Sequence, residues 1–182
     1  MSSLAPPIHD DDLYEVIGGK RVLLSKKSAY CALIAGQLAY HVGNFADSKQ
    51  AGRIAIKGLF HLTSNCDRRP DVAFVSYGRW LSTRSVPRTD DAWNVVPNLA
   101  AEVISPRDSA EGVEQKISEY FKAGVEIVWV VHPSQNKIHV YDSPTQIQVL
   151  TISDVLDGRP ALPGFRLPLV ELFAEPSEDK GS

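Results

Sequence analysis

Residues 99–104 read LAAEVI and are apolar at every position except Glu102. An apolar run of this length predicts a strand covered on both faces, because a strand with one face in water alternates apolar and polar residues. The runs at 71–76 and 127–131 have a similar character. Together these segments predict a single mixed β-sheet flanked by helices, an α/β or α+β fold.

Two helices are expected to flank this sheet. The first begins after Ser28, a good N-cap residue, and continues to residue 42, where Gly-Asn at 43–44 ends it. The second covers 108–123, because Asp108 and Glu111 have capping-box spacing and a glycine follows the last apolar residues.

The other expected elements are shorter. Residues 13–24 predict an N-terminal β-hairpin that turns at a Gly-Gly pair. Further strands are expected at 53–62, 137–141 and 149–152, and a long loop at 79–97. We expect one domain at 13–174, with flexible ends at 1–12 and 175–182.

Composition narrows the class of protein. The chain has 182 residues, 43% of them hydrophobic, and a formal net charge of −3. The charge argues against a protein that coats nucleic acid by bulk electrostatics, but it permits a local basic patch. Cys31 and Cys66 lack metal-ligand spacing and are expected to be free thiols. No signal peptide or membrane span is recognisable, so a cytoplasmic location is expected.

Three charged residues interrupt these apolar segments. Asp71 opens the run at 71–76, Glu102 interrupts the run at 99–104, and Lys116 interrupts the apolar stripe of the second helix. Lys116 lies three residues after Val113 and four before Tyr120, so it shares their helix face and points toward the sheet. Buried charges are costly unless they are paired or bound to metal. Their occurrence on consecutive elements indicates a site.

Each residue alone has an ordinary structural explanation. Asp71 follows a proline and could form a turn or a cap. Glu102 could be ion-paired or face an edge, and Lys116 could extend to solvent. The hypothesis of a site therefore depends on all three residues lying together.

Phosphodiester cleavage requires this set of groups. The carboxylates of Asp71 and Glu102, with the backbone carbonyl of Val103, are suitable oxygen ligands for Mg²⁺, for which Mn²⁺ can substitute. The metal lowers the pKa of bound water. Lys116 can orient the nucleophile and stabilise developing negative charge. Because a lysine gains nothing from burial, we expect its removal to cost little stability.

Several motifs support this reading through a family resemblance. They are DLYEVIGGK at 12–20, RPDVA at 69–73, AEVISP at 101–106, KISEY at 116–120, AGV at 123–125, VWVV at 128–131, LPGF at 162–165 and ELF at 171–173. In combination they resemble the Uma-two (Uma2) family of "putative restriction endonucleases", within the PD-(D/E)XK nuclease superfamily. The resemblance covers nearly the whole chain and implies a restriction-endonuclease-like fold.

The resemblance also implies roles by position. Asp71 and Glu102 match the two metal-binding acids. Ile104 stands where the standard motif has its lysine, and Lys116 matches a position on the helix to which that lysine has moved. Glu15 matches an early acidic residue that supports the site, and Tyr120 is a second candidate for support.

The chain departs from the family pattern at three positions. Lys57 stands where relatives often carry an acidic residue, and Tyr30 where a histidine is common. His132 replaces an aspartate at a turn. If the first two positions contribute to catalysis, this chain is impaired or inactive.

Two principal hypotheses therefore stand. The first is a Mg²⁺-dependent endonuclease that acts on DNA, with RNA left open, and that forms a homodimer to cut two strands. The second is a catalytically degenerate nucleic-acid-binding or scaffold protein on the same fold. A Ser or Cys hydrolase is disfavoured, because no G-x-S-x-G motif is present. Arg69, Arg79 and Arg84 are candidates for phosphate binding, with a solvated loop as the alternative.

Overall fold

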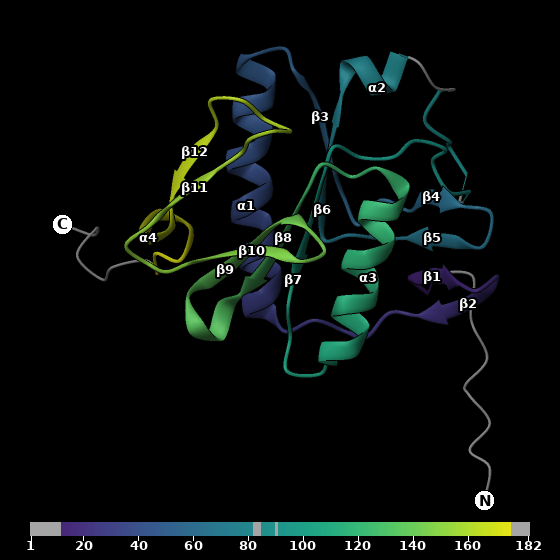
Figure 1. Cartoon of the computed structure of the whole chain (residues 1–182), viewed down its shortest axis with the longest axis horizontal. Helices are drawn as coiled ribbons and strands as arrows, with labels where there is room; N and C mark the ends of the chain where they lie inside the picture. The colour runs from purple at the N-terminus through teal and green to yellow at the C-terminus, as the bar shows by residue number, and fades with distance from the viewer. Residues whose placement is uncertain (1–11, 82–84, 90, 176–182) are drawn as a thin grey trace, which may run out of the picture.

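The central feature of the computed structural model, which describes residues 12–81, 85–89 and 91–175, is a six-stranded mixed sheet (Figure 1). Its strand order is β10-β9-β8-β7-β6-β3. The strands are β3 (Gly52–Ile56), β6 (Val72–Ser76), β7 (Leu99–Val103), β8 (Ile127–His132), β9 (Lys137–Ser143) and β10 (Gln146–Leu150). Only β7 and β8 pair in parallel, while the other neighbours are antiparallel. The predicted mixed sheet is confirmed, and the edge strand predicted at 149–152 is β10, which begins and ends earlier in the chain.

Helices cover both faces of this sheet. In Figure 1 its strands lie between α1 (Ala29–Ser48) and α3 (Ala110–Ala123). Side chains of β7 alternate between the two sides, because successive residues of a strand point to opposite faces. Leu99, Ala101 and Val103 pack in the core that includes α1, whereas Ala100 packs in the core that includes α3. This alternation directs Glu102 toward α3.

A second, four-stranded sheet lies beside α3, with the order β2-β1-β5-β4. Its strands are β1 (Tyr14–Ile17), β2 (Lys20–Leu23), β4 (Phe60–Thr63) and β5 (Cys66–Arg68). The predicted hairpin is confirmed as β1 and β2, with left-handed backbone at both turn glycines. Glu15 and Arg68 come from this sheet, on neighbouring strands.

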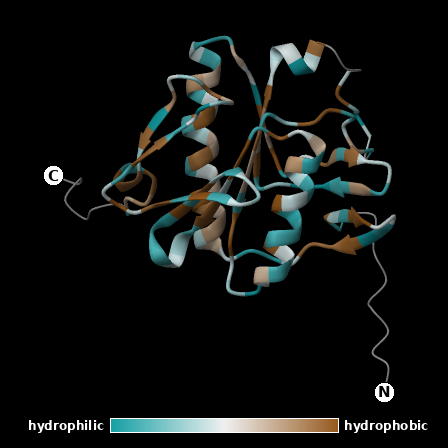
Figure 2. Cartoon of the chain, viewed as in Figure 1, coloured by the Kyte–Doolittle hydropathy of each residue, from teal (hydrophilic) through white to brown (hydrophobic). Residues whose placement is uncertain are grey.

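The two long helices differ from their predicted ends. The first continues past Gly43, because the turn that follows packs into the core, where Ala46 is fully buried. Gly43 itself faces the Ile54 side chain, which would lie 3.5 Å from a β-carbon at this position. The predicted stop at 43–44 is therefore wrong. The N-cap of α3 is Ser109, whose side chain accepts a hydrogen bond from Gly112, and not Asp108. Figure 2 shows hydrophobic and hydrophilic residues interspersed along both helices, as expected for helices that bury one face.

The segment predicted as one strand at 53–62 is two strands in different sheets, because Lys57 adopts a positive φ of 54° and turns the chain. Five elements were not predicted: β5, α2 (Tyr77–Leu81), the pair β11 (Val155–Asp157) and β12 (Arg166–Pro168), and α4 (Leu169–Leu172). A 3₁₀ turn, Pro133–Gln135, joins β8 to β9. Apart from Asp12 and Glu175, the predicted flexible ends lie outside the described residues. None of the helices in the described part of the chain has the length and apolar character needed to cross a membrane.

Gly52 provides a test of the packing between β3 and β6. A β-carbon at this position would lie 2.1 Å from the backbone oxygen of Val75, whereas one at Gly36, on the exposed side of α1, would meet nothing within 4 Å. We expect Gly52→Ala to lower the free energy of unfolding by more than about 2 kcal/mol. The matched change Gly36→Ala should raise it by roughly 0.5–1 kcal/mol. Urea unfolding of both variants checks this, and equal midpoints would contradict the packing described.

Candidate functional site

Lys116 and Glu102 form the centre of the site. The Lys116 Nζ lies 3.3 Å from both carboxylate oxygens of Glu102. One helical turn further along α3, the Tyr120 hydroxyl donates a hydrogen bond of 2.7 Å to Glu102 Oε1. Glu102 is 3% exposed and Tyr120 is fully buried. The helix face predicted from the sequence, which carries Lys116 and Tyr120, thus meets β7 at Glu102. Glu102 is the one carboxylate of that strand, and the alternation of side chains turns it toward α3.

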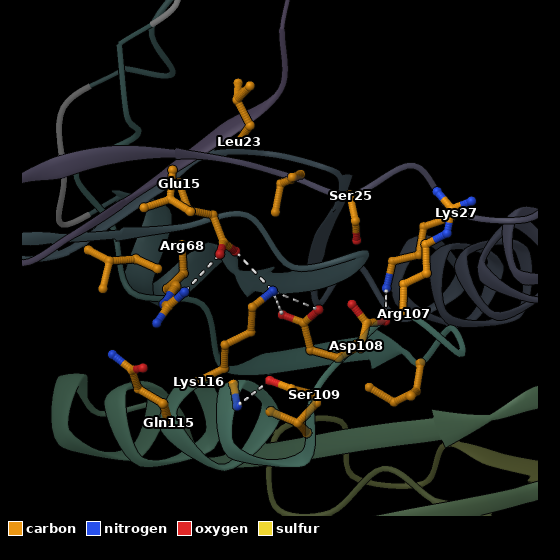
Figure 3. A pocket seen from close by; sticks show the side chains of 17 residues that line it. Glu15, Leu23, Ser25, Lys27, Arg68, Arg107, Asp108, Ser109, Gln115 and Lys116 are labelled. Atoms are coloured by element: carbon orange, nitrogen blue, oxygen red, sulfur yellow. Dashed lines mark hydrogen bonds and ion pairs between the residues drawn. The ribbon is translucent and has the colours of Figure 1, made fainter. Parts of the chain in front are cut away.

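Glu15 approaches the same ammonium from the second sheet. Its Oε1 lies 3.1 Å from Lys116 Nζ, and its Oε2 accepts a hydrogen bond of 2.8 Å from Arg68. Arg68 also donates to Glu119 on α3, at 2.5 Å. In Figure 3 the Lys116 side chain rises from the helix toward Glu15, with Arg68 on the other side of that carboxylate. Each buried charge here has an opposite charge beside it.

Asp71 lies beside Glu102 because β6 and β7 are antiparallel and Val72 pairs with Ala101. Asp71 is 1% exposed as a residue, and its Oδ2 accepts a hydrogen bond of 2.6 Å from the Val103 amide. Two lysines neutralise it: Lys27 Nζ lies 3.3 Å from Oδ2, and Lys57 is ion-paired with Oδ1.

Lys27 reaches further oxygens of the site. Its Nζ lies 2.5 Å from the Val103 carbonyl oxygen and 3.2 Å from Asp108 Oδ2. Asp108 also accepts hydrogen bonds from the amide and hydroxyl of Ser105, which fix its carboxylate at the end of β7. The charged residue expected to cap the helix therefore belongs to the site.

Burial and ion pairing act in opposite directions on the pKa values. Burial raises the pKa of Glu102, an effect that Lys116 offsets only in part. Burial lowers the pKa of Lys116, but Glu102 and Glu15 outweigh it, so the net pKa is raised. Lys116 is consequently an ammonium at neutral pH, which can donate hydrogen bonds and stabilise negative charge but cannot accept a proton.

A cleft of about 410 Å³ opens above these groups. Glu102, Lys116, Lys27 and Asp108 line it, together with the exposed Arg107 at its rim. Asp71 does not belong to the described residues that line the cleft, because it lies beneath Lys27. A ligand in the cleft meets Glu102 and Lys116 directly, but it meets Asp71 only past the Lys27 ammonium.

The structure brings most of the predicted site residues together, namely Asp71, Glu102, Val103, Lys116, Glu15 and Tyr120. The predicted phosphate-binding arginines are placed differently. Arg69 donates to the Tyr14 and Lys57 carbonyls, which ties the hairpin to the turn before β4.

Arg79 donates to the Val96 and Pro97 carbonyls, which come just before β7, at the end of that strand opposite Glu102. These contacts give both arginines a structural role, and phosphate binding by either one stays a prediction. Arg84 lies outside the described residues.

Lys27 and Asp108 were not predicted as members of the site. Arg68 was predicted only as part of a basic cluster that could contact phosphate, whereas the structure pairs it with Glu15 and Glu119. Lys27 lies in an irregular segment with no periodicity, and Arg68 on a strand of three residues that is too short to show any. Nothing in either pattern distinguishes them from surface cations. Asp108 gave no separate signal either, because its spacing from Glu111 already had an ordinary explanation as a helix cap.

The expectation that removal of Lys116 costs little stability assumed that a buried lysine gains nothing, and the structure contradicts that assumption. Lys116 is the partner of two carboxylates that are 2% and 3% exposed. Removing one member of a buried ion pair leaves an uncompensated charge, which is costly.

The donor groups fit a divalent cation. Asp71, Glu102 and the Val103 carbonyl supply hard oxygens, and Mg²⁺ commonly takes only one or two carboxylates and keeps several waters. Asp71 and the Val103 carbonyl already converge on one positive charge, the Lys27 ammonium. Within the described residues, no three His, Cys, Asp or Glu side chains form a metal-binding group. A metal here would therefore rely on the main-chain carbonyl.

Comparisons with known proteins identify the family and the fold. The family model of Uma2, described as "Putative restriction endonuclease", matches residues 3–170. A solved structure described as a "putative nuclease belonging to DUF820" from Anabaena variabilis superposes with a TM-score of 0.76 at 16% sequence identity, covering 88% of this chain and 89% of that one. At this identity the likeness shows the fold. No curated protein matches the sequence.

The pairing of Lys116 predicts a pH-dependent stability change. We expect Lys116→Met to lower the free energy of unfolding by about 2–4 kcal/mol near neutral pH, because Glu15 and Glu102 lose a shared counter-ion. A carboxyl whose folded pKa is raised stabilises less as the pH rises through that pKa, and removing the lysine raises the pKa of Glu102 further.

The loss should therefore be smaller at about pH 5 than at about pH 8. Urea unfolding at both pH values measures it. Lys122→Met, an exposed change on the same helix, is the control and should alter stability by less than about 1 kcal/mol. A loss that is equal at both pH values would contradict the coupling to Glu102.

Proposed function

Because the chain belongs to the Uma2 family, we propose that it is a metal-dependent endonuclease that hydrolyses phosphodiester bonds of DNA. The observation that carries the proposal is the Lys116 ammonium, held at 3.3 Å from Glu102 at the floor of a cleft that also exposes Asp108 and Arg107. A positive donor fixed beside buried carboxylates is the arrangement that phosphoryl chemistry uses to bind and stabilise negative charge.

Each residue has a distinct proposed role. In hydrolysis a bond forms between a water oxygen and phosphorus, a phosphorus–oxygen ester bond breaks, and the leaving oxygen ends with a proton that balances the one lost by the water. Lys116 donates to the attacking water or to a phosphate oxygen, and its raised pKa keeps it charged as negative charge develops. Tyr120 and Glu15 are positioning residues, because they hold the Glu102 carboxylate and the Lys116 ammonium in place.

The proposed metal ligands are Asp71, Glu102 and the Val103 carbonyl, with Mg²⁺ as the ion and Mn²⁺ as a substitute. When bound, the ion would lower the pKa of a coordinated water and neutralise charge on the scissile phosphate. The buried Val103 amide holds Asp71 Oδ2 in a fixed position beside Glu102.

The choice of DNA follows the description of the family. Arg107, exposed at the rim of the cleft, is the described arginine best placed to contact a phosphate. Two copies of the site are needed to cut both strands in one encounter, which is the reason to propose a homodimer.

A second candidate function is nucleic-acid binding without cleavage. The observation that favours it is the double pairing of Asp71, whose two oxygens are engaged by Lys27 and Lys57. Lysines that permanently replaced the metal would leave a basic cleft without catalysis. The experiments below separate the two functions.

The first experiment measures cleavage. Wild-type protein should nick supercoiled plasmid in the presence of Mg²⁺ or Mn²⁺, and Asp71→Asn, Glu102→Gln and Lys116→Met should each reduce the rate by about 100-fold or more, the size of effect seen for loss of one charge-stabilising group. Lys122→Met should cleave at the wild-type rate, because its side chain is exposed and outside the cleft.

Labelled RNA substrates run alongside assign the nucleic acid. Wild-type protein that binds DNA or RNA but cleaves neither in any divalent metal would favour the non-catalytic function. Full activity of Lys116→Met at a temperature where it is folded would remove Lys116 from the catalytic residues.

The second experiment measures metal binding through stability. Mn²⁺ should raise the melting temperature of the wild-type protein, because a ligand that binds only the folded state stabilises it. Asp71→Asn should remove most of this rise, since it deletes a charged ligand. A rise of the same size in Asp71→Asn would place the metal elsewhere.

A further inference from the structure

Three oxygens from separate parts of the site surround the Lys27 ammonium. They are Asp71 Oδ2 at 3.3 Å, the Val103 carbonyl oxygen at 2.5 Å and Asp108 Oδ2 at 3.2 Å. Two carboxylates and a main-chain carbonyl are the ligand types that divalent cations such as Mg²⁺ and Mn²⁺ prefer. Lys27 therefore lies where the oxygen donors of this site converge on one positive charge.

Lys57 does not have the same surroundings, although it also pairs with Asp71. It contacts the other carboxylate oxygen, Oδ1, whereas the Val103 carbonyl and Asp108 are contacted by Lys27. Both lysines compensate the negative charge of Asp71, but only Lys27 occupies the position between the oxygens of Asp71, Val103 and Asp108. This difference allows a matched comparison.

Lys27 also stands between Asp71 and the cleft. Its side chain is 17% exposed and lines the cleft, whereas the Asp71 side chain is 2% exposed beneath it. Lys27 belongs to residues 24–28, which form no helix or strand between β2 and α1. A lysine carries its charge on a flexible four-carbon stem, so the ammonium can leave without movement of the sheet.

We propose that Lys27 is an internal counter-ion that occupies the cation position of the site, and that a divalent ion binds Asp71 and the Val103 carbonyl only when the Lys27 ammonium is displaced. This inference rests on the proposed metal-dependent function and adds that the Lys27 ammonium competes with the metal ion for the same oxygens. The apo site is then charge-balanced and stable, and metal affinity is set by the exchange of one cation for another.

Direct titration with Mn²⁺, followed by calorimetry on the apo protein, tests the competition without a cleavage assay. Lys27→Met should bind Mn²⁺ about tenfold or more tightly than wild type, because the competitor is gone. Lys57→Met should tighten binding by about threefold or less, since it removes a nearby positive charge but leaves the cation position occupied by Lys27. Lys26→Met, at an exposed neighbouring position, should leave the affinity unchanged.

The outcomes distinguish the inference from the proposed function. Lys27→Met that binds no more tightly than Lys57→Met would overturn the competition, while Asp71-dependent binding in both would leave the metal site intact. If neither wild type nor Lys27→Met binds Mn²⁺ in a manner that Asp71→Asn abolishes, the proposed metal site fails and the inference fails with it.

A second measurement keeps Lys27 in place, in case its replacement prevents folding. In Lys26→Arg the only amine of residues 24–28 is Lys27, so acylation of this segment, quantified by mass spectrometry, reports that side chain alone. Saturating Mn²⁺ should raise the acylation rate of Lys27 several-fold relative to Lys122, because displacement exposes it. An unchanged rate at a Mn²⁺ concentration that calorimetry shows to be saturating would contradict displacement.

Discussion

The ion pair between Lys116 and Glu102 is the interaction on which the arrangement of the site depends. It joins α3 to the central strand β7, and its ammonium also holds Glu15 from the second sheet. Carboxylates this deeply buried are tolerated only when an opposite charge or a hydrogen-bond donor faces them. Two sheets and a helix are therefore fixed relative to one another by charge compensation around one lysine, and the cleft opens where that lysine is partly exposed.

Around this centre the charges alternate in two rows. Lys57 and Lys27 flank Asp71, and Lys27 continues to Asp108. On the other side, Arg68 bridges Glu15 and Glu119. A change in one member of such a row shifts the pKa values of its neighbours, and a bound metal ion would compete with the protein's own cations for the same carboxylates.

Much of the fold and the centre of the site could be predicted from the sequence. Glu102 and Lys116 were recognisable because each breaks a regular apolar pattern, and regular patterns report which face is buried. Lys27 could not be found in this way, since an irregular segment has no pattern to break, and its contacts with Asp71 and Asp108 arise only in the folded chain. The stop of α1 was misplaced because the packing of Gly43 against Ile54 is a tertiary contact that overrides the preference of Gly-Asn to end a helix. The small strand pair β11 and β12 was missed for a related reason, as three-residue strands show no alternation.

The most direct test of the site as a metal-dependent catalytic centre is the anomalous difference map of a crystal soaked in Mn²⁺. We expect a peak within coordination distance of Asp71, Glu102 and the Val103 carbonyl oxygen, with the Lys27 ammonium displaced toward the cleft and Lys116 still beside Glu102. A peak elsewhere in the molecule, or a site that remains filled by Lys27 when Mn²⁺ is saturating, would contradict it.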